Sequence, residues 1–224
     1  MDSFYKQTKL NHKFHFPIIL DLGANAGLES KKLYDIYGPD CSVILVEPFP
    51  DNINTIKFNI KKWGLEDRFF IDECAVDVVS GVKEFGYQSN MSGINGRFNG
   101  SLDPFNWKTW NYSGTIKVKT KTLDEICSNP NIVKIDIERQ EYIIFPYLVE
   151  LDSIQVIYLE LHGPCYSLNV KQFLEKHLEG TGLEITGWYK CYQSQREVND
   201  AYKPIESKEL INRGEDFTVI IERN

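Results

Sequence analysis

Short apolar runs alternate with segments of helical spacing along most of this chain. The apolar runs have the length and composition of buried strands and span residues 17–22, 42–47, 68–76, 131–138 and 154–163. The other segments repeat their apolar residues at helical spacing and span residues 29–38, 51–64, 139–151 and 170–180. This alternation predicts an α/β fold in which a parallel sheet carries helices on both faces.

The end of the chain and one long interval depart from the alternation. Residues 183–189 and 216–222 have strand patterns with no helix of normal length between them, which favours an antiparallel hairpin at the edge of a mostly parallel, seven-stranded sheet. Residues 81–121 are rich in Gly, Asn, Ser and aromatic residues, and a loop that long is commonly a lid or a binding loop. We expect one domain over residues 1–224, with an N-terminal extension at 1–16 and a substrate-binding loop or lid at 86–114.

Composition and charge are those of an ordinary soluble globular protein. The chain has 224 residues and a net charge of −7 without dense runs of Lys or Arg, which argues against a nucleic-acid partner. Its apolar stretches are shorter than the roughly 18 to 20 residues of a membrane span, and the first residues lack a signal-peptide pattern. We therefore expect a cytoplasmic protein with no membrane partner. The five widely spaced cysteines predict reduced, buried thiols rather than disulfides or a zinc site.

The first predicted strand ends in a glycine turn, DLGANAG, at residues 21–27. In open parallel sheets, ligands bind beyond the carboxyl ends of the strands. Glycines let the backbone approach a ligand, and the following helix N-terminus offers free N–H donors. Glu47 ends the second predicted strand, where an acid can accept both hydroxyls of a ribose. Together these features indicate a nucleoside site.

Two details of the turn favour S-adenosylmethionine over NAD. A dinucleotide turn has the pattern GxGxxG, whereas this turn has Asn25 in the place of the middle glycine. Asp21 precedes the turn, and a carboxylate there would repel a pyrophosphate but attract the sulfonium and ammonium groups of S-adenosylmethionine. An NAD-dependent enzyme is the weaker alternative.

The motifs also follow the order of a known family. IILDLGANAG, VEPFPDNINTIKFNI, DECAVDVVSG, TKTLDEI, VKIDIERQE and YLELHG lie between Pro17 and His162. This combination resembles the FkbM-type methyltransferases, which have a Rossmann-like class I fold and use S-adenosylmethionine. The resemblance implies O-methylation of a small-molecule, sugar or glycan-like hydroxyl. It also implies cofactor contacts from Asp21, Gly23, Ala24, Asn25, Gly27, Glu47, Pro48, Phe49, Asp72, Glu73, Cys74 and Ala75.

Carboxylates gather at the end of the fourth predicted strand, in NIVKIDIERQEY at residues 131–142. Asp136 and Glu138 share one strand face by the two-residue period, as do Glu160 and His162 on the fifth strand. We expect Asp136 to be the central catalytic residue, with Glu138 or His162 as the base that accepts the hydroxyl proton. Alternatively, Asp136, Glu138 and Glu160 hold a divalent cation such as Mg²⁺ that lowers the pKa of the hydroxyl.

The residues predicted to bind the acceptor are Arg139, Glu141, Glu160, Ser92 and Trp107. Helix capping is the alternative role for Glu138 and Glu141, and a plain strand-end role is the alternative for His162. At Arg139 and Gln140 the chain departs from the family it resembles, which usually has Gly and His there. Arg139 would then grip an acidic group of the acceptor by paired hydrogen bonds, or the change leaves a weakly active or non-catalytic cofactor-binding module. Ribose 2′-O-methylation is a further alternative, and it would need a basic channel.

Overall fold

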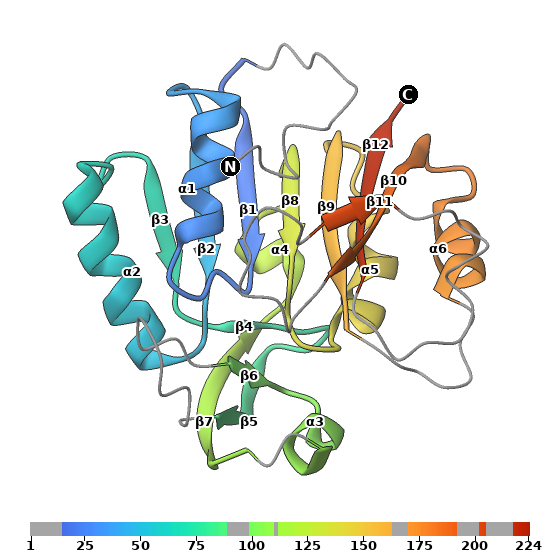
Figure 1. The fold of residues 1–224 in the computed structure, drawn as a ribbon. Helices are drawn as coiled ribbons and strands as arrows, with labels where there is room; N and C mark the ends of the chain where they lie inside the picture. Colours follow the sequence, from blue (N-terminus) through green and yellow to red (C-terminus); the bar gives the residue numbers. More distant parts are fainter. Residues whose placement is uncertain (1–14, 89–98, 110–111, 163–169, 192–201, 205–216) are drawn as a thin grey trace.

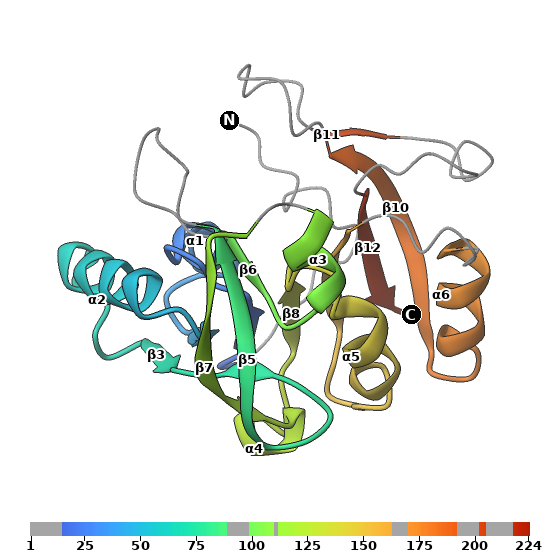
Figure 2. The ribbon, with the colours of Figure 1, turned by 90° about the horizontal axis from the view of Figure 1, so that it is seen from below.

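The described part of this protein folds into two sheets. The computed structural model describes residues 15–88, 99–109, 112–162, 170–191, 202–204 and 217–224. The main sheet has eight strands in the order β11-β10-β12-β9-β8-β1-β2-β3, and a smaller sheet has four in the order β4-β7-β5-β6. The smaller sheet lies below the edge at which β1, β2 and β8 end (Figure 1), and Figure 2 shows this arrangement from below.

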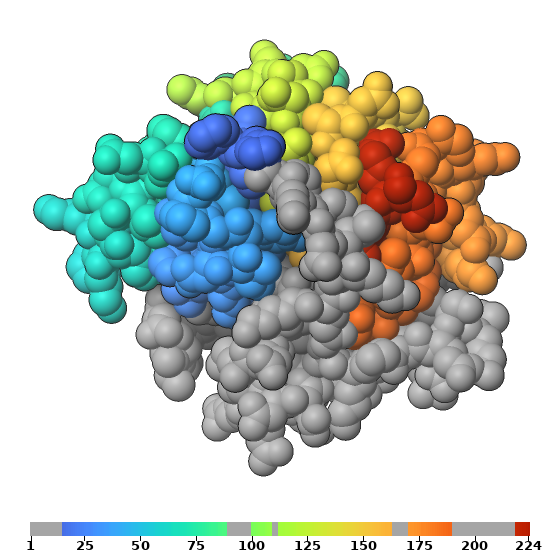
Figure 3. All heavy atoms as spheres, turned by 90° about the horizontal axis from the view of Figure 1, so that it is seen from above, coloured from blue at the N-terminus to red at the C-terminus, as the bar shows by residue number. Residues whose placement is uncertain are grey.

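The main sheet is parallel at its centre and antiparallel at one edge, as the sequence pattern predicted. Its parallel strands are β1 (Ile18–Leu22), β2 (Ser42–Val46), β3 (Phe69–Asp72), β8 (Ile132–Ile135) and β9 (Val156–Leu161). The antiparallel strands are β10 (Leu183–Cys191), β12 (Phe217–Arg223) and the short β11 (Tyr202–Pro204). Three residues are too few to show an alternating pattern, which explains why the prediction had seven strands. From above, β12 lies beside the region of β10 and α6 and far from α2 (Figure 3).

Helices cover both faces of the main sheet. The described helices are α1 (Leu28–Tyr37), α2 (Pro50–Trp63), α3 (Pro104–Thr109), α4 (Leu123–Ile126), α5 (Glu141–Leu148) and α6 (Val170–Leu178), of which α3 packs against β5 and β6 of the smaller sheet. On one face, Ile19 of β1 belongs to the same buried cluster as Leu33 of α1 and Ile56 of α2. On the other face, Leu20 belongs to the cluster that contains Phe145 of α5. Among the described helices, none is both long and apolar enough to cross a bilayer.

The interval expected to be one long irregular loop contains most of the smaller sheet. The sheet consists of β4 (Ala75–Val76), β5 (Gly81–Gln88), β6 (Asn99–Ser101) and β7 (Gly114–Lys121). The predicted strand at 68–76 breaks between β3 and β4, where the Cys74 N–H donates to the Asp72 carbonyl at 2.9 Å. Cys41, Cys74 and Cys127 are buried free thiols, as predicted.

Candidate active site

The glycine turn lies between the carboxyl ends of β2 and β8. The N–H groups of Gly23 and Ala24 donate to the Val46 carbonyl at 3.0 and 3.1 Å. Gly23 has φ +82°, and a Cβ added there would lie 1.9 Å from the Asp136 carbonyl oxygen. Only glycine fits a left-handed position with so close a backbone neighbour. The turn therefore brings its backbone against the strand end that carries Asp136.

Glu47 lies at the end of β2 with its carboxylate facing the glycine turn. One oxygen accepts the Asn25 N–H at 2.8 Å, and the other accepts the Phe49 N–H at 3.0 Å and the Asn52 side-chain amide at 3.2 Å. Burial raises the pKa of Glu47 to about 7, although these donors partly offset the effect. The carboxylate is thus fixed at the end of β2, facing the glycine turn.

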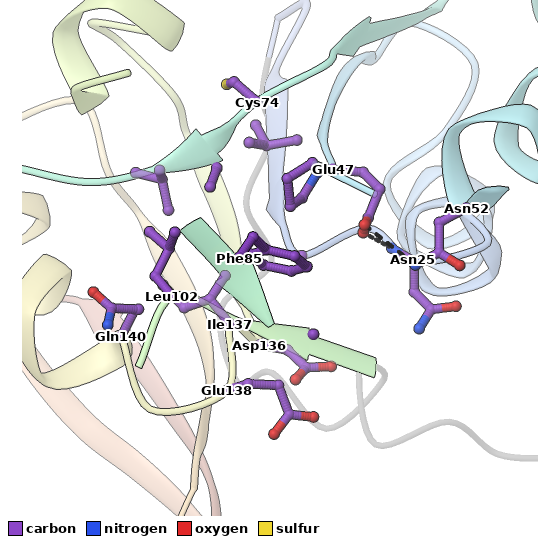
Figure 4. A pocket seen from close by; sticks show the side chains of 16 residues that line it. Asn25, Glu47, Asn52, Cys74, Phe85, Leu102, Asp136, Ile137, Glu138 and Gln140 are labelled. Atoms are coloured by element: carbon purple, nitrogen blue, oxygen red, sulfur yellow. Dashed lines mark hydrogen bonds between the residues drawn. The ribbon is translucent and has the colours of Figure 1, made fainter. Parts of the chain in front are cut away.

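A cavity opens between the glycine turn, the end of β8 and the smaller sheet, and its empty space, including the part open to solvent, is about 610 Å³. Figure 4 shows Glu47 and Asn25 at one end of it, and Asp136 and Glu138 directing their carboxylates to the same side at the other end. The described residues that line it are Gly23, Asn25, Val46, Glu47, Pro48, Asn52, Cys74, Ala75, Val76, Phe85, Gly100, Leu102, Asp136, Ile137, Glu138 and Gln140.

Half of the residues predicted to contact the cofactor line this cavity, namely Gly23, Asn25, Glu47, Pro48, Cys74 and Ala75. Ala24 is buried within the turn, and Gly27 takes a left-handed conformation at φ +74° before α1. Phe49 packs beside Tyr87 in the core of the smaller sheet, with ring centroids 5.1 Å apart. The described cavity lining does not include these three residues.

The other three predicted cofactor residues are acids that pair elsewhere. Asp72 lies 2.7 Å from Lys121, and the half-exposed Glu73 lies 2.5 Å from Lys57. Asp21 is fully buried and accepts the Ser30 hydroxyl at 2.5 Å. Among the described residues, the cavity lining includes none of these acids.

Lys134, which was not predicted as a site residue, links the glycine turn to Asp136 at the end of β8. Its ammonium group donates to the Gly23 carbonyl at 2.9 Å and lies 3.2 Å from Asp21 and 3.3 Å from Asp136. Burial alone would lower the pKa of Lys134, but the nearby carboxylates raise it above its ordinary value. The side chain therefore stays charged inside the protein.

The predicted catalytic residues converge on His162. Its Nδ1 lies 2.9 Å from Glu141, and its Nε2 lies 3.6, 3.8 and 3.9 Å from Asp136, Glu160 and Glu138. Burial opposes a charge on the imidazole, but Glu141, Glu138 and Asp136 raise the pKa of His162 well above its usual value. Burial would likewise raise the pKa of Asp136, yet Lys134 and His162 lower it. The end of β8 and the end of β9 thus form one compact ionic cluster.

Glu141 lies at the first residue of α5 and is also a partner for His162. It is fully buried there, and the Oε1 atom that contacts His162 also accepts the Ile137 N–H at 2.9 Å. Glu141 thus has the position that favours an acid at a helix N-terminus, but Ile137 precedes the helix, and the N-cap of α5 has no side-chain capping hydrogen bond.

Arg139 is engaged by the smaller sheet and its helix. Its Nε lies 2.8 Å from Asp103, and its guanidinium carbon lies 4.5 Å from the centroid of the Phe105 ring. The neighbouring Glu138 carbonyl accepts the Ser101 hydroxyl at 2.6 Å and the Asn106 amide at 3.0 Å. These contacts fasten the turn after β8 to the segment that carries β6 and α3.

The two remaining residues predicted to bind the acceptor are Trp107 and Ser92. Trp107 covers Gly86, where an added Cβ would lie 2.2 Å from the indole, and its N–H donates to the Ser101 carbonyl at 2.7 Å. This contact holds α3 against β5 and β6. Ser92 lies outside the described residues.

Comparisons with known proteins agree with this architecture. A family model described as a methyltransferase FkbM domain matches residues 21–179. The solved structure of methyltransferase FkbM from Methylobacillus flagellatus KT aligns with a TM-score of 0.56 and 13% identity over 96% of this chain and 46% of that one. This chain therefore spans less than half of that protein.

A precorrin-6y C5,15-methyltransferase from Geobacter metallireducens GS-15 aligns with a TM-score of 0.48 and 13% identity, over 93% of this chain and 80% of that chain. No curated protein sequence matches this chain significantly. The predicted fold, a mostly parallel α/β sheet of Rossmann-like type, is confirmed by the likeness to the structure from Methylobacillus flagellatus KT.

Proposed function

Because this chain belongs to the FkbM methyltransferase family, we propose that it is an S-adenosylmethionine-dependent O-methyltransferase that acts on a hydroxyl of a sugar or glycan-like acceptor. The cavity carries this proposal, since it has a hydrogen-bond acceptor for a ribose at one end and a group of acids at the other. The methyl donor would span the distance between them.

The residues of the cavity fit S-adenosylmethionine group by group. Glu47 offers carboxylate oxygens to the ribose hydroxyls. Phe85, Cys74 and Leu102 provide an apolar wall for the adenine, and the Gly23 backbone allows the methionine portion to approach closely. Once bound, the cofactor supplies a methyl group on a positively charged sulfur, and Asp136 is the lining carboxylate next to the turn.

A hydroxyl acceptor needs a group that takes up its proton as the methyl group is transferred. Glu138 suits this role by position, because it lines the cavity, whereas His162 lies behind it with one ring nitrogen already held by Glu141. A positioned base contributes about 10²- to 10⁴-fold, and orientation of the reactants contributes about 7–11 kcal/mol. Lys134 fixes Asp136 beside the turn, so that the acceptor side is held in place by salt bridges and hydrogen bonds.

A polyhydroxy acceptor matches this acidic end better than a nucleic acid does. Carboxylates accept hydrogen bonds from several hydroxyls at once, whereas they repel the phosphates of an RNA strand. The carboxylate groups of Asp136, Glu138 and Glu160 all lie within 4 Å of His162. This concentration of negative charge favours a neutral sugar over a ribose embedded in RNA.

The proposal is tested in two steps with the full chain. Titration calorimetry first measures binding of S-adenosylmethionine and of S-adenosylhomocysteine, with NAD as the competing cofactor. Methyl transfer from isotopically labelled S-adenosylmethionine is then followed by mass spectrometry over a panel of oligosaccharides and a structured RNA. We expect binding of both adenosyl compounds and labelled sugar. If neither adenosyl compound binds, the proposal is refuted. Binding without methyl transfer to any acceptor identifies a non-catalytic cofactor-binding module.

A further inference from the structure

His162 directs one ring nitrogen into a group of carboxylates without forming a hydrogen bond there. The nearest carboxylate oxygens, from Asp136, Glu160 and Glu138, lie 3.6, 3.8 and 3.9 Å from Nε2, beyond hydrogen-bonding distance. The His162 side chain as a whole is 9% exposed. An imidazole nitrogen with several carboxylate oxygens at this distance has the arrangement of ligands around a shared cation.

The spacing of these atoms fits a single metal ion. One ligand atom each from Asp136, Glu160 and His162 lies within 4.8 Å of the other two. Two ligands on a cation with bonds of 2.0–2.4 Å are about 2.8–3.9 Å apart at bond angles of 90–110°. The separations of Nε2 from Asp136 and Glu160, 3.6 and 3.8 Å, lie within that range. The ligand oxygens of Asp136 and Glu160 lie within 4.8 Å of each other, so these two carboxylates would draw together around a bound ion.

Glu141 orients the imidazole as the outer partner of a metal ligand does. Metal-binding histidines usually donate their other ring N–H to a carboxylate or a carbonyl, which fixes the ring and its tautomer. Here Nδ1 lies 2.9 Å from Glu141, which is itself held by the Ile137 N–H at 2.9 Å. In the tautomer that donates from Nδ1, Nε2 presents its lone pair to Asp136 and Glu160.

The charges around His162 also leave room for a cation. Four carboxylates, from Asp136, Glu138, Glu141 and Glu160, surround the ring. Lys134 lies between Asp136 and the buried Asp21 and is shared by these two carboxylates. A divalent cation would offset part of the negative charge around the ring.

We propose that Asp136, Glu160 and His162 bind one divalent cation of the Mg²⁺ and Mn²⁺ class, with Glu141 as the residue that positions His162. Two carboxylates and one imidazole suit Mn²⁺ and Mg²⁺ better than they suit the softer metals that prefer thiolates. The cation would lie where Asp136 meets the cavity, and there it would hold an acceptor oxygen. This last role, unlike the binding itself, rests on the proposed function.

Binding of Mn²⁺ to the chelator-treated full chain tests the site directly. Electron paramagnetic resonance of free Mn²⁺ reports binding without cofactor or acceptor, and we expect one saturable site. Glu160→Gln and His162→Gln should each raise the dissociation constant by more than about 10-fold, and Glu141→Gln by about 10- to 100-fold although it does not touch the ion. Glu175→Gln, on the exposed face of α6 where it pairs with Lys171, is the matched carboxylate control and should bind as wild type does.

Circular dichroism establishes that each variant is folded before it is scored. Failure of the wild-type chain to bind Mn²⁺ saturably overturns the proposal. Wild-type affinity in folded Glu160→Gln or in folded His162→Gln overturns it as well, since both residues are assigned as ligands. These outcomes are independent of the methyl-transfer assay, because a chain that binds S-adenosylmethionine but no metal contradicts only the cation site.

Discussion

Arg139 occupies a backbone conformation that favours glycine. Its φ is +81°, and the preceding Glu138 has φ +53°. A side chain in the left-handed region costs about 1–2 kcal/mol. The contacts of the guanidinium offset this cost, since a charge-assisted hydrogen bond like that to Asp103 contributes about 1.5–3 kcal/mol. The contact with Phe105 adds about 0.5–1 kcal/mol.

These magnitudes predict an order of stability among variants at this position. Arg139→Ala keeps the strain and loses both contacts, so it should lower the free energy of unfolding by about 2–4 kcal/mol. Arg139→Gly loses the same contacts but relieves the strain. After the extra freedom of glycine in the unfolded chain is subtracted, it should be about 0.5–1.5 kcal/mol more stable than Arg139→Ala. The glycine that the family usually has at this position would then fit the turn without strain. Arginine fits it only with the contacts to Asp103 and Phe105.

Urea denaturation of the three proteins measures these differences through the free energy of unfolding. Lys31→Ala serves as the control, because Lys31 forms an exposed pair with Asp35 on α1 and should change stability by less than about 0.5 kcal/mol. Arg139→Ala that is as stable as Arg139→Gly refutes the strain at this turn. Wild-type stability in Arg139→Ala refutes the importance of the contacts with Asp103 and Phe105.

Three further changes test the cofactor and acceptor sides of the cavity. Gly23→Ala should lower the free energy of unfolding by about 2–5 kcal/mol, because the added Cβ would meet the backbone of Asp136. The control Gly64→Ala, at φ +67° with open space around it, should lower it by only about 1–2 kcal/mol in the same urea assay. Equal losses in the two variants would exclude the clash with Asp136. Ribose hydroxyls favour ionised Glu47, so a bound ribose should lower the pKa of Glu47 from its value of about 7 in the free protein. Calorimetry should therefore show that S-adenosylhomocysteine binding weakens by up to about tenfold per pH unit as the pH falls below that value. Glu47→Gln should remove this pH dependence, and a pH dependence that persists in Glu47→Gln would belong to another group. Asp136→Asn should cut methyl transfer by at least about 10²-fold with little change in cofactor affinity, and wild-type turnover in this variant would disprove its role.

The main sheet was predictable from the sequence because its central strands are buried on both faces. β8 and β9 are therefore mostly apolar, with Lys134 and Glu160 as their charged residues. The smaller sheet was missed although β7 carries an alternating pattern, in which Ile116 and Val118 alternate with Lys117 and Lys119. In β5 and β6, glycines and polar residues obscure the alternating pattern of a strand. The fit of Trp107 over Gly86 joins residues distant in sequence, so local patterns contain no sign of it.

The candidate site was predictable where it depends on strand ends and not where it depends on tertiary pairing. Glu47 and Asp136 were identified because strands β2 and β8 end beside them. The pairing of Arg139 with Asp103 joins residues 36 positions apart, so it depends on where α3 docks. Lys134 was hidden because a single lysine inside an apolar strand resembles an ordinary exception to a pattern.

The position of Lys134 changes which acid would face the proposed cofactor. Its three ammonium hydrogens have three neighbours, the Gly23 carbonyl, Asp21 and Asp136. Asp21 is fully buried beneath the turn, and a carboxylate there must be compensated by a neighbouring cation. Its charge is therefore largely balanced within the protein. The negative charge that a sulfonium would meet then comes from Asp136, whose side chain is 32% exposed and borders the cavity. One lysine thus supports the turn from below and orients the acid that stands beside the proposed methyl donor.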